Sequence, residues 1–271
     1  MKKPIKNGFT LVEIAIVMFI MALMLGTGLT LLSAQQDQRK IEDNTARLNE
    51  VHEALIGFAI TYGRLPCPTQ ASLATGQINA GEEALTGNTC ACQSTTGPSS
   101  TIADLSASKV ACVNTTVTGV LPWAKLGISE TDAWGHRFTY RVTTIFADDI
   151  TAITYGCTPP TAPTQSSFAL CSNGNLAVLS TVGGSNVAST LPAVVVSHGT
   201  NGLGAYTPTG QQILPIAAAN TNETENANND INFVSHTTAP AGETGGYFDD
   251  QVIWLSQYTL FNRMVQAGKL P

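Results

Sequence analysis

The chain has 271 residues and a formal net charge of −6, and charged residues make up only 12% of its composition. An acidic chain lacks the positively charged stripe that nucleic acids require, so we expect no nucleic-acid partner. The sequence contains no Gly-x-Ser-x-Gly elbow, phosphate-binding loop or His-Glu-x-x-His pair, and its four histidines are scattered. We therefore expect a protein that is not an enzyme.

The chain begins with a short basic leader, residues 1–8, that carries three lysines and no acid. Such a leader is typical of a segment that stays on the cytoplasmic side of a membrane. From Phe9 to Gln36 the only charged residue is Glu13, and this run exceeds the roughly 20 residues that cross a hydrocarbon core. A secretory signal peptide has a shorter apolar region followed by its cleavage site. We therefore predict a membrane-spanning segment over residues 9–36.

The junction between leader and apolar run reads Lys-Asn-Gly-Phe-Thr-Leu-Val-Glu over residues 6–13. With the basic leader and the apolar run, this segment resembles the type IV prepilin family, which includes the pseudopilins of type II secretion systems. The resemblance implies that a prepilin peptidase cuts between Gly8 and Phe9 and methylates the new amine of Phe9. It also implies that the apolar run stays in the mature protein.

Glu13 is an unusual residue for a membrane span. A carboxylate at the bilayer centre costs about 2.5–3.5 kcal/mol on insertion scales, so we expect a partner that offsets this cost. By the resemblance, the α-amino group of Phe9 in a neighbouring subunit approaches Glu13 in a low-dielectric setting. Phe9 and Glu13 are thus the predicted assembly residues. The alternative is an ordinary single-pass anchor that contains one acid.

The helix is predicted to continue beyond the membrane. Apolar residues keep a helical spacing after Gln36, which indicates an amphipathic continuation over residues 37–63. These residues are Ile41, Leu48, Val51, Leu55, Phe58 and Tyr62. Gly63 should end the helix, because Pro66 and Pro68 forbid its continuation. One helix over residues 9–62 would match the long spine helix of the family that the N-terminus resembles.

Gly26 and Gly28 lie within the apolar half of this helix and weaken it by about 1 kcal/mol each. They would permit either local melting on assembly or close packing against another helix. Both readings stay open.

Residues 64–271 form a predicted extracytoplasmic head of class α+β, in which the long helix packs on an antiparallel sheet and disulfides staple the loops. Valine, isoleucine, threonine and aromatic residues concentrate in five runs, between turn-forming glycines and asparagines. The predicted strands are Phe138–Phe146, Leu176–Thr181, Ala193–Ser197, Ile231–Ser235 and Gln251–Leu255. We also predict a last helix that Ser256 caps and that continues to Gln266, with Gly268 closing it.

All six cysteines lie in the head, which indicates disulfides in an oxidising compartment. They are Cys67, Cys90, Cys92, Cys112, Cys157 and Cys171, and six cysteines allow 15 pairings. We predict Cys157–Cys171, which closes a local proline-rich loop, and Cys67–Cys112, which ties down the helix exit. Cys90 and Cys92 would then bridge each other or exchange roles with the second pair. A metal site is the competing idea, but a Cys-x-Cys without a second pair supports it weakly.

A second resemblance covers Asp132-Ala-Trp-Gly-His-Arg-Phe-Thr-Tyr140. It is similar to the Asp-Pro-Trp-Gly…Tyr segment of type II secretion pseudopilins, with Ala133 in place of the proline. We expect Asp132 and Gly135 to shape a turn and Trp134 to anchor it on the spine helix. A structural role is expected for this segment rather than ligand binding.

Acidic and amide residues gather near the C-terminus, over residues 223–230 and at Asp249 and Asp250. Carboxylate and amide oxygens suit Ca²⁺, which takes 6–8 oxygen ligands, and some of the pseudopilins that the chain resembles bind calcium in their heads. The hypothesised ligands are Asp230, Asp249 and Asp250. The spacing is not that of an EF-hand, and solvated turns are the alternative.

These features lead to one principal hypothesis. We expect the protein to be a minor structural subunit of a type IV pilus-like filament. A single helix would hold it in the inner membrane with its head in the periplasm, and the protein would be exposed at the cell surface after assembly. Its partners would be the prepilin peptidase and N-methyltransferase, other pilin or pseudopilin subunits and the inner-membrane assembly platform. Alternatives are a pseudopilin of a type II secretion system and an adhesin or substrate-binding pilin at a filament tip. A membrane-anchored enzyme comes last.

Overall fold

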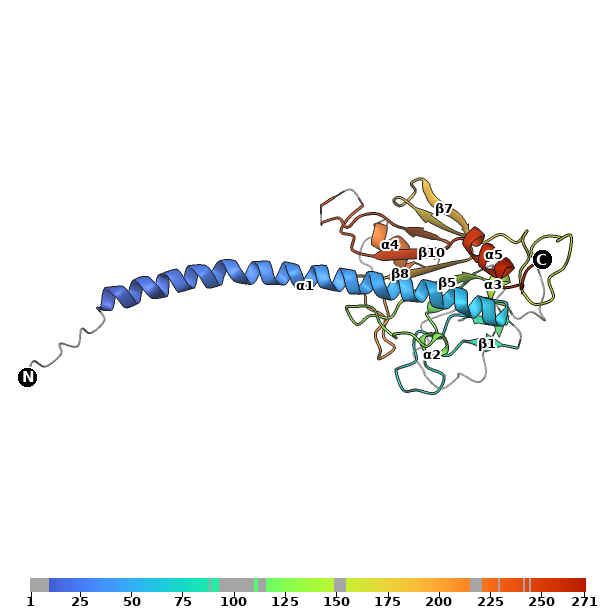
Figure 1. Ribbon diagram of the computed structural model, residues 1–271, viewed down its shortest axis with the longest axis horizontal. Helices are drawn as coiled ribbons and strands as arrows, with labels where there is room; N and C mark the ends of the chain where they lie inside the picture. The colour runs from blue at the N-terminus through green and yellow to red at the C-terminus, as the bar shows by residue number, and fades with distance from the viewer. Residues whose placement is uncertain are drawn as a thin grey trace, which may run out of the picture. The chain divides into compact units, whose positions relative to one another are not determined.

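The computed structural model describes residues 10–87, 89–92, 110–111, 116–148, 155–214, 221–228, 230–240, 242–243 and 245–271. The chain divides into two compact units, residues 1–44 and residues 45–271. Helix α1 (Leu11–Tyr62) contributes to both units and is drawn in blue in Figure 1. Its 52 residues run without interruption through Gly26 and Gly28.

The N-terminal part of α1 exposes apolar side chains. Leu11, Val12, Ile14, Ile16, Val17, Met18, Phe19, Ile20 and Met21 are all between 47% and 85% exposed. Within the part of the chain whose side chains are described, no helix combines the length and the apolarity that a membrane crossing requires. Phe9 and the side chains of residues 23–34, which belong to the predicted span, lie outside that part.

Helix α1 ends at Tyr62, as the sequence predicts. Gly63 adopts φ +73°, and its N–H donates to the carbonyl of Ala59 at 2.8 Å. A Cβ at this position would lie 2.0 Å from the carbonyl oxygen of Gln165. Glycine is therefore needed here both for the left-handed backbone that closes the helix and for the close approach of a distant loop.

The head is built around a four-stranded antiparallel sheet with the order β10-β8-β5-β4. Its strands are β4 (Thr116–Val120), β5 (Thr139–Thr143), β8 (Ala193–Ser197) and β10 (Gln251–Leu255). The predictions for β8 and β10 are confirmed residue for residue. The strand predicted over residues 138–146 ends early, because the chain turns into the short helix α3 (Thr144–Ala147), which buries Phe146 against Phe168 at a ring distance of 4.9 Å.

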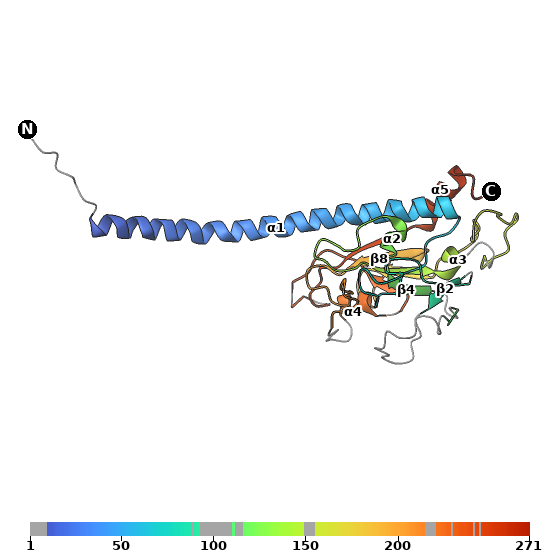
Figure 2. The ribbon, with the colours of Figure 1, turned by 90° about the horizontal axis from the view of Figure 1, so that it is seen from below.

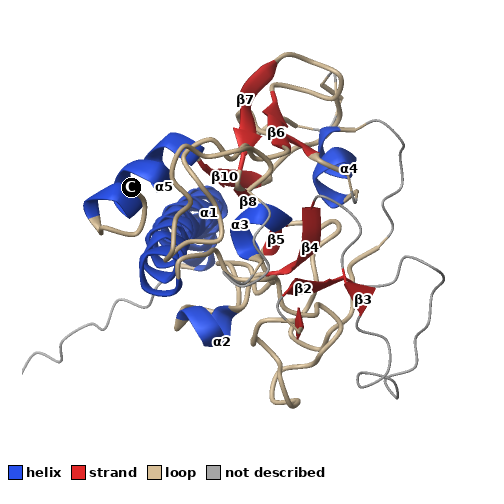
Figure 3. Cartoon of the chain, turned by 90° about the vertical axis from the view of Figure 1, so that its right-hand side faces the viewer, coloured by secondary structure: helices blue, strands red, loops and turns tan. Residues whose placement is uncertain are grey.

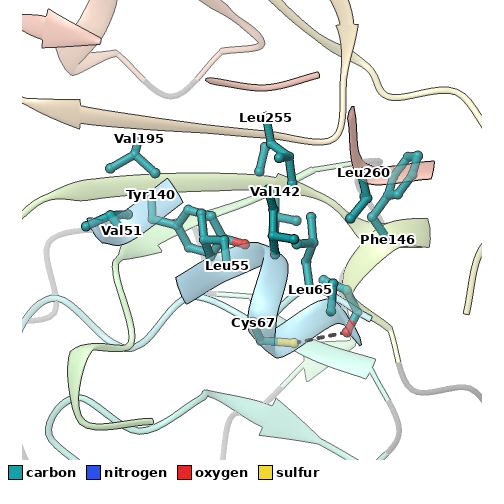
Figure 4. Close-up of a cluster of buried hydrophobic side chains, with 14 of the residues drawn as sticks. Val51, Leu55, Leu65, Cys67, Tyr140, Val142, Phe146, Val195, Leu255 and Leu260 are labelled. Atoms are coloured by element: carbon teal, nitrogen blue, oxygen red, sulfur yellow. Dashed lines mark hydrogen bonds between the residues drawn. The ribbon is translucent and has the colours of Figure 1, made fainter. Parts of the chain in front are cut away.

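One face of this sheet packs against the last turns of α1. Alternation along β5 directs Tyr140 and Val142 toward the helix, as Figure 4 shows, and Val195 of β8 points to the same side. From α1, this core receives Leu48, Val51, Leu55, Ile56 and Ala59. Helix α5 (Gln257–Gln266) lies beside α1 and adds Leu260, Phe261 and Met264 (Figure 2). The predicted packing of the helix on an antiparallel sheet is confirmed.

The opposite face of the sheet carries a second, three-stranded sheet with the order β7-β6-β9. Its strands are β6 (Leu176–Leu179), β7 (Asn186–Leu191) and β9 (Asn232–Val234), and β6 pairs antiparallel with β7 but parallel with β9. Val194 and Val196 of β8 pack against this layer. Figure 3 shows the resulting three layers, with the end of α1 and α5 on one side and β6 and β7 on the other.

Short elements complete the head. Strands β1 (Leu85–Thr86), β2 (Thr89–Cys92) and β3 (Val110–Ala111) form a small antiparallel sheet. Helix α2 (Trp123–Leu126) precedes β5, and helix α4 (Asn222–Ala227) precedes β9. Helix α5 begins after Ser256, as predicted, but the Ser256 side chain makes no capping hydrogen bond. Gly268 has φ +69° just beyond the end of α5.

The disulfide prediction is right for one pair and wrong for another. Cys157–Cys171 is confirmed, with a Cα–Cα distance of 6.0 Å. Cys67 pairs with Cys90, not with Cys112, at a Cα–Cα distance of 5.4 Å. The same bond excludes a Cys90–Cys92 bridge. Cys112 and the side chain of Cys92 lie outside the described residues.

A buried ion pair explains the choice of Cys90. Arg64 donates to Glu83 at 2.6 Å, and the same carboxylate accepts the backbone N–H of Cys67 at 2.8 Å. This contact holds the segment after Glu83 against the exit of α1. The β1–β2 hairpin that follows pairs Leu85 with Cys90 and so brings Cys90 back to Cys67. The sequence does not predict that this segment returns to Cys67, because the Arg64–Glu83 ion pair joins two loops that have no periodic pattern.

Candidate functional site

The start of α1 forms a capping box. The Glu13 carboxylate accepts hydrogen bonds from the backbone N–H and from the hydroxyl of Thr10, both at 2.8 Å. The Glu13 N–H in turn donates to the Thr10 hydroxyl at 3.3 Å. This is the reciprocal arrangement of Thr-x-x-Glu at a helix N-terminus. The predicted processing residues, Gly8 and Phe9, lie outside the described part of the chain.

Both hydrogen bonds to the Glu13 carboxylate end on the same oxygen, Oε2. Among the described residues, Oε1 accepts none. A second hydrogen-bond donor or a positive group can therefore reach this carboxylate without breaking the cap.

The Asp132 turn forms as predicted. Asp132 Oδ1 accepts the backbone N–H groups of Trp134 and His136, both at 2.9 Å, and Oδ2 accepts the Ser197 hydroxyl at 2.8 Å. The side chain that joins this turn to α1 is Arg47, which donates to the carbonyl oxygens of Thr131 at 2.9 Å and of Asp132 at 3.2 Å. The sequence predicts an anchoring role for Trp134, which is half-buried, and does not identify the arginine.

A cluster of three acids joins helix α4 to the residues that precede β10. Glu223, Asp249 and Asp250 can each offer one carboxylate oxygen, and these oxygens lie within 4.8 Å of one another. Two of the hypothesised calcium ligands, Asp249 and Asp250, are thus together, but the third member is Glu223. Asp230 does not belong to the group, because its carboxylate accepts the N–H of Asn232 at 2.7 Å and holds the turn into β9.

Helix α4 selects Glu223 rather than its neighbours. Thr221 caps the helix by accepting the N–H of Thr224 at 3.2 Å. The helical period then buries Glu223 and Asn226, whereas Glu225 stays partly exposed. The sequence carries this signal, since a threonine followed by an acidic run is a helix start, but the run reads equally well as a polar loop.

The cluster is closed by the loop after β8. Asn201 donates its amide to both oxygens of Glu223, at 3.1 and 2.9 Å, and the N–H of Thr200 donates to Asp249 Oδ2 at 2.7 Å. Gly199 has φ +56°, and a Cβ there would lie 2.4 Å from the Asp249 carboxyl carbon. Only glycine allows the loop to approach the acids this closely.

Burial shapes the electrostatics of the cluster. It raises the pKa of the Asp250 carboxyl well above its usual range, although the Asn226 amide, which donates at 2.8 Å, opposes the shift. Burial also raises the pKa of Glu223 to about 7, against the hydrogen bonds from Asn201, and the nearby charge of Asp249 adds to the rise. Without a counterion, the Asp250 and Glu223 carboxyls therefore tend to hold protons.

Three buried polar atoms at this site have no hydrogen-bond partner among the described residues. They are Asp249 Oδ1, Asp250 Oδ1 and His198 Nδ1. His198 is fully buried, its Nδ1 lies 3.9 Å from Asp250 Oδ1, and burial lowers its pKa to about 3. The imidazole is therefore neutral and supplies no positive charge to the acids. A buried carboxylate oxygen without a partner costs free energy, and a bound cation would remove this cost. The unpartnered oxygens therefore indicate that this site can bind a cation.

The geometry fits a hard divalent ion. Calcium binds oxygen at 2.3–2.6 Å, so two of its ligands lie at most about 5 Å apart. The 4.8 Å limit among the three carboxylate oxygens meets this condition. Glu223, Asp249 and Asp250 are thus the residues that would hold the ion.

The comparisons with known proteins bear on the N-terminus. Residues 4–29 match the family model described as the prokaryotic N-terminal methylation motif. No curated protein and no solved structure matches the chain. The matched segment contains Gly8, Phe9 and Glu13. The chain therefore carries the prepilin-type cleavage and methylation signal of type IV pilins and pseudopilins.

Proposed function

We propose that this chain is a minor structural subunit of a type IV pilus-like filament. In this proposal, residues 9–36 hold it in the inner membrane with the head in the periplasm, and a prepilin peptidase cuts between Gly8 and Phe9. The observation that carries the proposal is the methylation motif over residues 4–29. The exposed apolar side chains between residues 11 and 21, within the matched segment, support it, because extensive exposed apolar surface marks membrane or protein interaction sites.

Glu13 is the residue proposed to direct assembly. Its Oε2 is occupied by Thr10, and its Oε1 is available to an outside donor. The methylated amine that cleavage creates on Phe9 of a neighbouring subunit is such a donor, and it carries the opposite charge. In a low-dielectric surrounding this pairing favours one axial register between subunits.

The N-terminal mass tests the proposal. Protein recovered from the cell envelope should begin at Phe9 and carry one methyl group. Gly8→Val should leave the leader attached, because it places a bulky side chain at the bond to be cleaved. Asn7→Ala is the matched control in the leader and should be processed normally. An intact leader in the wild-type protein, or a cut beyond residue 36, would reject the proposal.

A pseudopilin of a type II secretion system is the alternative role. The Asp132 turn supports it, since the segment that resembles pseudopilins forms the expected turn. A strain lacking the chain separates the two roles. Loss of surface filaments with normal secretion of exported enzymes fits the pilus subunit, and the reverse result fits the pseudopilin.

A second proposed function is calcium binding by Glu223, Asp249 and Asp250. The unpartnered oxygens of Asp249 and Asp250 carry it. A calcium ion would link α4, which leads into β9 of the three-stranded sheet, to the start of β10 in the four-stranded sheet. It would thereby hold the two sheets of the head together. Calorimetric titration of the purified head-containing chain with Ca²⁺ tests binding directly.

Two variants on the same helix make that titration specific. Glu223→Gln should weaken calcium binding at least tenfold, because it removes a charged ligand. Glu225→Gln is the matched control and should bind normally, since Glu225 bonds Asn228 at 3.0 Å outside the cluster. Equal affinity of both variants, or no heat of binding to the wild-type chain, would contradict the calcium proposal.

A further inference from the structure

The loop closed by Cys157–Cys171 has a composition found nowhere else in the described head. Its first half reads Thr-Pro-Pro-Thr-Ala-Pro-Thr over residues 158–164. Three threonines thus recur at every third position, each next to a proline. The disulfide joins the two ends of the loop across a Cα–Cα distance of 6.0 Å. The loop has no part in the N-terminal motif or in the acidic cluster.

The two halves of the loop differ in burial. Residues 166–169 are buried, and the Ser167 hydroxyl donates to the carbonyl of Ile145 at 3.2 Å. Thr158, Thr161 and Thr164 are all exposed. Their hydroxyls make no hydrogen bond to any described residue. The buried half anchors the loop, and the exposed half presents three free hydroxyls to solvent.

The anchoring contacts hold the exposed half in place. Tyr155 donates its hydroxyl to the carbonyl of Pro163 at 3.0 Å, and Ser172 donates to the carbonyl of Tyr155 at 2.7 Å. Lys269, near the C-terminus, reaches Gln165 at 3.2 Å. The prolines lack N–H groups and fix φ near −65°, so this stretch cannot enter a helix or the interior of a sheet. In Figure 1 the loop lies at the end of the head beside α3 and the C-terminus.

We propose that Thr158, Thr161 and Thr164 are acceptors of O-linked glycosylation. Threonine- and serine-rich segments with proline are typical of O-glycosylated chains, because they stay extended and need not pack in a core. A transferase needs an accessible hydroxyl on an extended backbone, and these three residues provide it. The disulfide and the Tyr155 contact keep the acceptors at a constant place on the head.

The reaction balances with a phosphate-activated sugar as the co-substrate. The threonine Oγ1 forms a bond to the anomeric carbon of a sugar that a nucleotide or lipid carrier holds through a phosphate. The bond between that carbon and the phosphate oxygen breaks, and the carrier leaves as the phosphate. The hydroxyl proton passes to a base of the transferase. No oxidation or reduction takes place.

Mass spectrometry of the full chain from the cells that produce it tests the inference. After reduction, chymotrypsin cuts beyond Tyr155 and Phe168 and releases the segment 156–168 as one peptide. We expect this peptide to be heavier than its sequence by whole sugar residues, and fragmentation that preserves side-chain bonds should place them on the three threonines. The same sample reports the mature N-terminus separately, so failure of this inference and failure of the filament proposal are distinguishable.

Variants make the test specific. Thr158→Ala, Thr161→Ala and Thr164→Ala combined should remove all added sugar mass from the chain. Thr259→Ala, at an exposed threonine of α5 with no neighbouring proline, should keep it. Recovery of the Cys157–Cys171 linked peptide without reductant shows that the triple variant keeps its loop. An unmodified wild-type peptide, or sugar that survives the triple substitution, would overturn the inference.

Discussion

Thr10 and Glu13 cap one another at the first turn of α1, and both hydrogen bonds from Thr10 end on a single oxygen of the Glu13 carboxylate. Glu13 therefore has two separable properties: a hydrogen-bond acceptor that starts the helix and a charge that can meet a partner. A glutamine retains the first property and loses the second. This difference allows the assembly role to be tested apart from the helix cap.

The first prediction concerns Glu13→Val and Glu13→Gln. Valine should improve membrane insertion, because it removes a transfer cost of about 2.5–3.5 kcal/mol, and should reduce recovery in sheared filaments. Glutamine should restore the cap but not assembly, because the neutral amide cannot pair with the Phe9 amine. Membrane fractionation and filament shearing measure the two effects separately. If Glu13→Gln assembles as the wild-type chain does, capping alone explains the residue.

The second prediction concerns the disulfides. A non-reducing digest should link the peptide of Cys67 to that of Cys90, and the peptide of Cys157 to that of Cys171. Cys67→Ser with Cys90→Ser should lower the free energy of unfolding by about 2–4 kcal/mol, because the unfolded chain regains the freedom of the closed loop. Chemical denaturation measures this loss. A Cys67–Cys112 peptide would instead show that the Arg64–Glu83 contact does not determine the pairing.

The third prediction compares two arginines. Arg47→Ala should lower the unfolding free energy by about 1–3 kcal/mol, because the carbonyls of Thr131 and Asp132 lose a charged donor. Arg263→Ala is the control: its ion pair with Glu53 is exposed and 3.7 Å long, so the change should stay below about 1 kcal/mol. Denaturant titration of both variants measures the two losses of unfolding free energy. Equal losses would mean that the Asp132 turn is held by other contacts.

The fourth prediction is a pH dependence in calcium-free buffer. The folded-state pKa of Glu223 is about 7, above its usual value of 4.5, so the folded chain binds more protons between these values than the unfolded chain. Stability contributed by this group is present below pH 4.5 and is lost as the pH rises to about 7. Glu223→Gln should lack this decline.

His198 titrates in the opposite sense, because its folded pKa of about 3 lies below its usual 6.5 and favours stability as the pH rises. That contribution is common to the wild-type chain and to Glu223→Gln. The difference between their unfolding free energies, measured by thermal or chemical denaturation from pH 4.5 to 8, therefore reports Glu223 together with its effect on Asp250, whose pKa the Glu223 charge helps to raise. A difference that stays constant over this range would contradict the raised pKa.

Local patterns in the sequence were enough to predict several elements. Gly63 marks the end of α1, because only a residue that tolerates positive φ closes the helix there. The consecutive valines of β8 and the apolar run of β10 predict their strands, since β8 is buried along its length and β10 packs its side chains against the cores on both faces of the sheet. The prepilin-type signal is likewise local and needs no tertiary contact to be recognised.

Other features depend on contacts between distant segments. The sequence gives no reason to expect β4, because Gly119 interrupts it; the structure shows that a Cβ there would lie 2.5 Å from the carbonyl oxygen of Thr69. Cys67 pairs with Cys90 where the Arg64–Glu83 ion pair and the β1–β2 hairpin bring two segments of the chain together. Glu223 joins Asp249 and Asp250 across a helix and a strand, in place of Asp230. Propensity and periodicity act over a few neighbouring residues, whereas these three outcomes depend on which remote groups can be buried together.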